Sequence, residues 1–214
     1  AAQSPTGQEY HVKAGFIYNF ARFIEWPENT FETNNLISLC IASDHHNDVF
    51  FSLNNKIVKG KKLKVKECEW DCCCPVSKEN SESILSELKK MVPKLGNKKK
   101  DCGCEESGPC HILFIDSEDR RFIQRRLERT KNQNVLTVGG MKGFIEMGGI
   151  IGFFTDQKKL RYEVNLYPAK QSGLKLRYKL LMSAARVIDR PGRMKKPGKR
   201  AHGNEGMDRH RRSD

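Results

Sequence analysis

The sequence lacks any apolar run of the roughly 18 to 20 residues that are needed to cross a bilayer. It also lacks the motifs of several enzyme classes, namely the nucleophile elbow, the Walker loop, Gly-x-Gly-x-x-Gly and His-Glu-x-x-His. No Cys-x-x-Cys pair and no haem attachment signature occur either. We therefore expect no enzyme activity and no cofactor.

Cysteine is plentiful by contrast, with eight in 214 residues. That is high for a cytosolic protein that binds no metal, and it favours an oxidising compartment. The first residues, Ala1 to Pro5, resemble the small-residue context that signal peptidase leaves behind. Both observations lead us to expect an exported protein.

The net charge of +13 is concentrated in part at the end of the chain. Residues 191–214 contain eight basic and three acidic residues, a net charge of +5, and almost nothing apolar. This composition predicts a disordered basic tail over residues 190–214. A solvated tail is the expected role, and contact with an anionic surface such as lipid headgroups, cell-wall polymers or nucleic acid is the alternative. We expect no nucleic-acid partner for the protein.

The centre of the predicted fold is a strand, helix, strand unit. Residues 112–115 form an apolar run that is too short for a helix, which is typical of a strand covered on both faces. Ser117 is the expected N-cap of an amphipathic helix over 118–131, and residues 135–138 form the next strand. A crossover helix between two strands favours parallel pairing.

Two further strands, within 148–154 and 160–165, are joined by a turn that is too short for a crossover, so they should form an antiparallel hairpin. Before the centre, the pattern predicts a helix over 11–26, a strand over 36–42 and an alternating strand ending near Cys68. The sequence thus predicts an α/β fold with a mixed β-sheet flanked by helices, a Rossmann-like three-layer sandwich.

After the hairpin, the apolar spacing from Leu174 to Ile188 predicts a terminal helix that ends before Pro191. Between the second strand and the central strand, residues 69–109 change in character and form a cysteine-rich insertion with one predicted helix, about 81–91. Both features complete a single predicted domain with a basic tail.

Several motifs occur in one order along the chain and resemble those of the YfiR family (DUF4154). They are Lys13 to Pro27, Cys110 to Ile115 with Ser117 and Glu118, Val135 to Val138, Gly143-Phe144, Gly148-Gly149, Arg161 to Asn165, and Gly173 to Lys175. The resemblance covers residues 9–189.

The resemblance implies a mixed sheet between helices, a periplasmic location and no known catalysis. In this family a member holds a membrane-bound diguanylate cyclase inactive by contact with that enzyme's periplasmic domain. The expected partner is therefore the periplasmic domain of a membrane-bound signalling protein, and the apolar opening helix makes a homodimer a second candidate. The alternative function is a periplasmic sensor of a metal or small ligand.

The resemblance also implies a disulfide between Cys68 and Cys110, while Cys40, inside an apolar strand, is expected to be a buried free thiol. Five cysteines are left in the insertion, and they have three interpretations: disulfide staples, a thiolate metal site, or a redox-sensitive bridge. They are Cys72, Cys73, Cys74, Cys102 and Cys104. We assign no metal ligand among them.

The last candidate site follows the opening helix. Trp26 and Glu25 are expected mainly to pack and to cap, but an exposed Trp at this position would suit a surface that binds a partner protein. They are the candidate partner surface.

Overall fold

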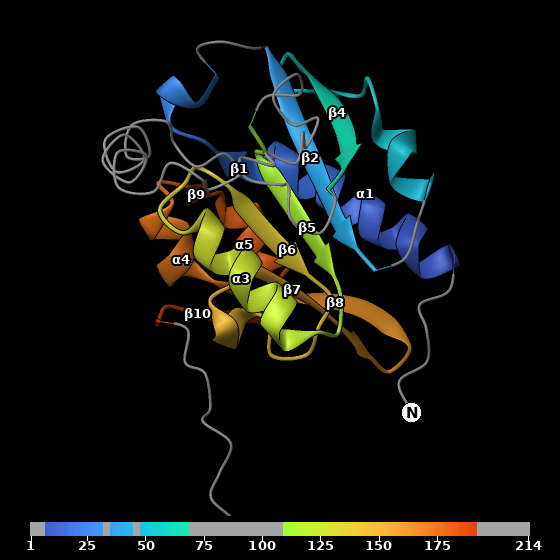
Figure 1. The fold of residues 1–214 in the computed structure, drawn as a ribbon, viewed down its shortest axis with the longest axis vertical. Helices are drawn as coiled ribbons and strands as arrows, with labels where there is room; N and C mark the ends of the chain where they lie inside the picture. The colour runs from blue at the N-terminus through green and yellow to red at the C-terminus, as the bar shows by residue number, and fades with distance from the viewer. Residues whose placement is uncertain (1–6, 32–34, 45–47, 69–108, 192–214) are drawn as a thin grey trace, which may run out of the picture.

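A mixed sheet runs through the middle of the molecule, with helices on both faces (Figure 1). This computed structural model describes residues 7–31, 35–44, 48–68 and 109–191. Within them, eight strands form the main sheet in the order β10-β8-β7-β6-β5-β2-β4-β3, and β1 pairs with β9 in a small second sheet. The predicted fold class, a mixed sheet flanked by helices, is confirmed.

The elements follow the predicted order as far as the hairpin. The helices are α1 (Gly7–Phe23), α3 (Arg120–Thr130), α4 (Leu166–Gln171) and α5 (Tyr178–Met182), with short 3₁₀ turns η1 (Glu28–Phe31), η2 (Asp48–Leu53) and η4 (Ile145–Met147). The strands are β1 (Ile24–Glu25), β2 (Leu36–Ser43), β3 (Ile57–Val58), β4 (Lys61–Glu67), β5 (Ile112–Asp116), β6 (Leu136–Gly139), β7 (Ile151–Asp156), β8 (Lys159–Asn165), β9 (Lys175–Leu176) and β10 (Arg186–Ile188).

The neighbouring strands β4, β2, β5, β6 and β7 are parallel to one another, β3 pairs antiparallel with β4, and β7 and β8 form the predicted antiparallel hairpin. β2 lies between β4 and β5, so the chain leaves β2 toward one side and later returns on the other. This arrangement places the end of β4 and the start of β5 on opposite sides of β2. Cys68 follows β4 and Cys110 precedes β5, so these two cysteines lie on either side of Cys40 in β2.

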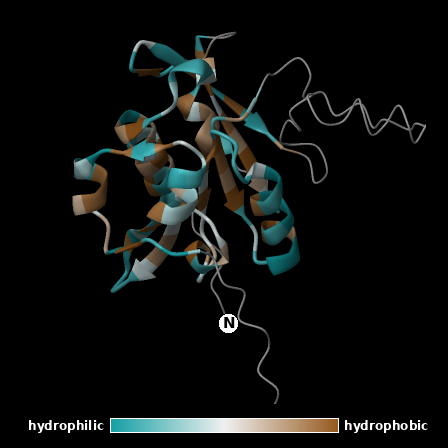
Figure 2. Ribbon diagram, turned by 90° about the vertical axis from the view of Figure 1, so that its left-hand side faces the viewer, coloured by the Kyte–Doolittle hydropathy of each residue, from teal (hydrophilic) through white to brown (hydrophobic). Residues whose placement is uncertain are grey.

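The two faces of the sheet carry separate apolar clusters. Alternating residues of β2 such as Leu39 and Ile41 face the α1 side, where Phe20, Phe153 and Tyr162 pack with them in the larger cluster. The smaller cluster lies under α3 and contains Leu113, Phe122 and Leu127 together with the cysteines. Figure 2 shows the same division, with apolar strands inside and a hydrophilic outer surface on α3. Among the described helices, none is long and apolar enough to span a membrane.

The N-cap of helix α3 lies two residues later than expected. Its N-cap is Asp119, whose carboxylate accepts hydrogen bonds from the backbone N–H groups of Arg121 and Phe122. Ser117 instead accepts a hydrogen bond from the N–H of Asp119. The prediction of Ser117 as the cap is therefore wrong, because the carboxylate two residues on satisfies the free N–H groups of the first turn directly.

The predicted terminal helix is also wrong. Residues 174–188 instead form β9, the short helix α5 and β10. β9 pairs with β1 directly after α1, and β10 pairs in parallel with β8 at the edge of the main sheet. These long-range pairings override a helical spacing that the local sequence carries.

Two packed features hold the C-terminal half together. The ring of Phe144, which is fully buried, lies between Gly139 and Gly149, where an added Cβ would come within 2.3 and 2.0 Å of ring atoms. The buried amide of Asn165 donates to the carbonyls of Ile145 and Arg190 and accepts from the N–H of Tyr167. A side chain of another shape in place of Phe144 or Asn165 would force the surrounding side chains to repack.

Candidate functional site

A pocket of about 230 Å³ opens beside the end of the opening helix. It contains both residues of the predicted partner surface, Glu25 and Trp26, and we call it the aromatic pocket. Its lining residues are Glu25, Trp26, Phe31, Ile37, Lys59, Lys61 and Arg177. They come from five separate stretches of the chain, so the fold, and not one local motif, creates the pocket.

The pairing of β1 with β9 builds one wall of the pocket. Ile24 lies opposite Leu176, and the N–H of Arg177 donates to the carbonyl of Phe23. This places the guanidinium of Arg177 against Glu25, with Nε 2.7 Å from Oε1. The two residues are 152 positions apart in the sequence, so their pairing depends on the β-pairing alone.

The turn between β3 and β4 builds the opposite wall. Lys59 lies in this turn with a positive φ of 51°, and its ammonium donates to the carbonyl of Ile24 at 2.5 Å. Lys61 follows on β4, where its Nζ lies 4.7 Å from the ring centre of Phe31 and 3.0 Å from the amide oxygen of Asn35. Both lysines are thus oriented toward the pocket by specific contacts.

The charges of the pocket are unequal. Three cations, Lys59, Lys61 and Arg177, line the pocket with the single carboxylate of Glu25 and leave a net charge of +2. The hydrogen bond from Arg177 lowers the pKa of Glu25, so this carboxylate is ionised at neutral pH. Burial, and then the nearby charge of Arg177, lowers the pKa of Lys59. The ordinary pKa of a lysine side chain is so far above neutrality that the pocket stays cationic at neutral pH despite this shift.

Aromatic rings form the floor. Trp26 and Phe31 meet edge to face with ring centres 5.8 Å apart, and Phe31 stacks on His111 at 4.8 Å. The indole N–H of Trp26 is buried and has no hydrogen-bond partner in the described part of the chain. A buried donor without an acceptor costs about 1 to 3 kcal/mol. The two rings give the pocket an apolar floor.

His111 connects this floor to the sheet. Its Nδ1 accepts the N–H of Ser38 on β2, so the neutral ring carries its proton on Nε2. Burial lowers the pKa of His111 to about 4, although the backbone of Thr30 opposes the shift. The ring is therefore neutral at physiological pH and acts as a packing group, not as a base.

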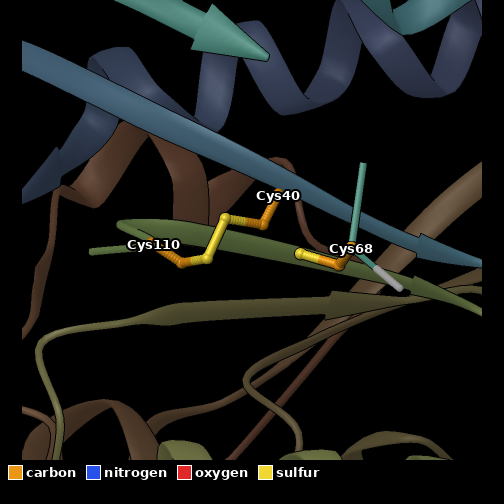
Figure 3. Close-up of side chains that lie close together, drawn as sticks. All are labelled: Cys40, Cys68 and Cys110. Atoms are coloured by element: carbon orange, nitrogen blue, oxygen red, sulfur yellow. A yellow bond between two sulfur atoms is a disulfide. The ribbon is translucent and has the colours of Figure 1, made fainter. Parts of the chain in front are cut away.

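Three cysteines converge on the other face of the sheet, under α3. Cys40 on β2 and Cys110 before β5 form a disulfide with Cα atoms 5.9 Å apart. Cys68, at the end of β4, points its sulfur toward this bridge (Figure 3). All three sulfurs lie within 4.8 Å of one another, and all three side chains are buried.

The expected pairing of Cys68 with Cys110 is therefore wrong, and so is the expectation that Cys40 is a free thiol. β4 and β5 flank β2 on opposite sides, and Cys110 precedes the start of β5 while Cys68 follows the end of β4. Cys40, on the strand between them, has the nearer sulfur. The resemblance indicated which strand ends carry cysteines but not which strand lies between them.

The remaining predicted cysteines lie outside the described residues, as does most of the predicted tail. These cysteines are Cys72, Cys73, Cys74, Cys102 and Cys104.

The sequence also did not reveal four of the pocket residues, namely Phe31, Lys59, Lys61 and Arg177. The turn around Gly60 was the available signal for the two lysines, and nothing local placed Arg177 beside Glu25.

Comparison with known proteins decides the family. A family model described as YfiR/HmsC-like (DUF4154) matches residues 10–185. The chain belongs to this family. The match includes the whole aromatic pocket and all three clustered cysteines, so both sites are part of the family domain. No curated protein matches the chain.

Proposed function

We propose that this YfiR/HmsC-like protein is a non-catalytic regulator in the periplasm, which holds a membrane-bound diguanylate cyclase inactive by binding that enzyme's periplasmic domain. Membership of the family supports a regulatory role. The observation that carries the contact mechanism is the aromatic pocket, because its chemistry is that of a protein interface.

Interface hot spots are rich in Trp, Tyr and Arg, in pockets that exclude water and are surrounded by a polar rim. The aromatic pocket has this composition, with Trp26 and Phe31 on its floor and Arg177 at its rim. Its volume of about 230 Å³ admits one large side chain and not a whole nucleotide or cofactor. The occupant is thus one anchoring residue of a partner protein.

The rim determines which partner sequence fits. With a net charge of +2, it attracts an apolar anchor that has acidic neighbours and repels one with basic neighbours. The partner segment is therefore an aromatic or aliphatic residue flanked by Asp or Glu.

The disulfide is physically connected to this pocket. Cys110 is bonded to Cys40 and is followed by His111, whose ring stacks on Phe31 in the pocket floor. Reduction would release the start of β5 and with it the support of Phe31. Repression is therefore redox-sensitive, and it weakens in a reducing periplasm.

The test is complementation in the native host. Deleting the gene should raise cellular cyclic di-GMP, and restoring the wild-type chain should lower it again. A chain carrying Lys59→Glu and Lys61→Glu reverses the charge of the rim, from +2 to −2, and should fail to lower cyclic di-GMP although it is exported and folded.

The matched control is Lys158→Glu with Lys159→Glu, the same charge change at the exposed turn of the β7–β8 hairpin. It should restore repression fully. Equal repression by both double variants would rule out the pocket as the contact surface. Unchanged cyclic di-GMP after deletion of the gene would contradict the regulatory role itself.

A further inference from the structure

The hairpin of β3 and β4 carries a concentration of positive charge that extends beyond the aromatic pocket. Residues 56–66, which we call the lysine hairpin, contain six lysines and no acidic residue. The lysines are Lys56, Lys59, Lys61, Lys62, Lys64 and Lys66. Lys59 and Lys61 line the aromatic pocket, and the other four lie outside it. These four have no part in the site described above.

Strand register places two of these lysines and one apolar residue on the same face of the hairpin. Lys62 and Lys64 alternate along β4 with Leu63 and Val65, whose side chains are buried in the apolar cluster on the α1 side. Ile57 of β3 lies directly opposite Lys62 in the antiparallel pair, so its side chain is on the same face as that lysine. The face that points away from α1 therefore combines one aliphatic and two cationic side chains.

All three side chains of this face are accessible. Lys62 and Lys64 are exposed, and neither has an ion pair within the part of the chain that the structure describes. Ile57 is 54% exposed, which is unusual for a large hydrophobic side chain in the described residues. The hairpin forms one end of the strand order, at the edge of the sheet (Figure 1). An extended surface that approaches this edge can contact the lysines and the isoleucine together.

From this combination, we infer that the lysine hairpin binds the anionic lipid headgroups of a membrane surface. The ammonium groups of Lys62 and Lys64 contact the headgroup phosphates, and the side chain of Ile57 enters the apolar boundary beneath them. One apolar or one electrostatic contribution alone gives only marginal membrane binding, and the two reinforce each other. Membrane binding requires no partner enzyme, so it can be measured apart from the proposed repression.

Two other roles for the lysines do not account for the isoleucine. Lysines on an edge strand prevent pairing with other chains, but an exposed aliphatic residue beside them has the opposite effect. A nucleic-acid backbone would use the lysines and leave Ile57 without a role, because phosphate contacts come from charged and polar groups. A membrane surface uses both the charge and the apolar side chain.

The fold holds the hairpin in the shape that binding needs. The side-chain oxygen of Asn54 accepts a hydrogen bond from the N–H of Val65 at 2.7 Å, and the hydroxyl of Tyr18 on α1 donates to the carbonyl of Ile57 at 3.1 Å. The Nζ of Lys56 lies 5.6 Å from the ring centre of Tyr18. The hairpin is thus fixed to α1 on its inner side, so binding costs little ordering of the backbone.

The test is flotation of the purified full chain with vesicles that contain phosphatidylglycerol and phosphatidylcholine, compared with vesicles of phosphatidylcholine alone. The wild-type chain should bind the anionic vesicles at least about ten-fold more tightly. Salt at about 0.5 M should remove most of this difference, because the Debye length is then only about 4 Å. No binding to the anionic vesicles, or equal binding to both kinds, would overturn the inference.

Two matched double variants locate the binding surface. Lys62→Gln with Lys64→Gln should weaken binding to the anionic vesicles by about 10- to 30-fold, since each lysine near such a surface contributes roughly a five-fold factor. The control, Lys158→Gln with Lys159→Gln, removes the same charge at the exposed turn of the β7–β8 hairpin and should change binding by less than about three-fold. The basic tail is present in both, so equal binding by the two would show that the tail alone binds and would overturn the inference.

The apolar contribution is tested at Ile57, whose exposure makes its replacement harmless to folding. Ile57→Ser should weaken binding to the anionic vesicles by about five-fold, from the apolar area that the exposed half of the side chain removes from water. Ile57→Trp places a residue that favours the membrane interface there and should strengthen binding, with a blue shift of its fluorescence on the vesicles. Unchanged binding by both variants would contradict insertion of this side chain and overturn the inference.

Discussion

The Cys40–Cys110 disulfide should be one of the largest single contributions to the stability of the domain. Its two cysteines are separated by 70 positions. In the chain-entropy model, a loop of that length stabilises the folded state by about 4 kcal/mol at room temperature. Replacing both residues by Ala also removes two buried sulfur atoms, each worth roughly 1 kcal/mol of apolar packing. The total expected loss in free energy of unfolding is about 4 to 6 kcal/mol.

The assay is urea unfolding followed by far-UV circular dichroism, with and without a dithiol reductant. With a slope near ~2 kcal/mol/M, the midpoint of the double Ala variant should fall by about 2 to 3 M. The reductant also acts on the other cysteines. The change in free energy of unfolding that it causes in the variant is therefore subtracted from the change that it causes in the wild type. That difference isolates the one bridge.

The expected difference is about 4 kcal/mol. A difference below about 1 kcal/mol would mean that Cys40 and Cys110 are not joined in the folded protein, or that their bridge does not constrain the unfolded chain.

Three further predictions concern the same scaffold. Gly149→Ala should lower the free energy of unfolding by more than about 3 kcal/mol, because its Cβ would lie 2.0 Å from a ring atom of Phe144. The control Gly15→Ala has nothing within 4 Å of its Cβ and should be neutral or stabilise helix α1 by up to ~1 kcal/mol. Equal effects of the two variants in thermal or urea unfolding would contradict the packing of Phe144. Asn165→Ala should cost about 2 to 3 kcal/mol, since it leaves buried backbone groups without partners, and a loss under ~0.5 kcal/mol would show that water replaces the amide. The pKa of His111 is lowered to about 4 in the folded state, below its ordinary 6.5, so the unfolded chain binds more protons between these two values. The free energy of unfolding should therefore fall as the pH drops through that window, by about 2 to 3 kcal/mol at pH 4.5. The His111→Gln variant should lose this part of the pH dependence, and an unchanged slope would argue against a buried neutral ring.

The central part of the fold follows from local sequence patterns. The short apolar runs at 112–115 and 135–138 and the helix between them identify a parallel unit, because period and length distinguish these elements without knowledge of distant residues. The hairpin of β7 and β8 follows in the same way from a turn too short for a crossover. These elements are decided by residues within about 20 positions of each other.

The C-terminal part does not follow from such patterns. The spacing of Leu176, Leu180 and Leu181 is helical, yet pairing with β1 and β8 divides this segment into strand, short helix and strand. Strand pairing depends on which edges are open elsewhere in the fold, and that information is not in the segment itself.

The sites show the same limit. Trp26 and Glu25 could be singled out as candidate partner residues from their position after the opening helix, but the cations around them come from distant stretches. Cys110 was correctly expected to form a bridge, and its partner was wrong because strand order, which places β2 between β4 and β5, is a tertiary property. Local patterns identify the chemically interesting residues, and topology determines their partners.

The most direct test of the proposed function is cyclase turnover in washed membranes from the host that lacks this gene, measured as conversion of GTP to cyclic di-GMP with the purified protein added to the periplasmic side. Turnover should fall several-fold with the wild-type protein and with the Lys158→Glu, Lys159→Glu control, and should not fall with Lys59→Glu, Lys61→Glu. Turnover that stays the same with every form of the protein would contradict the proposed function.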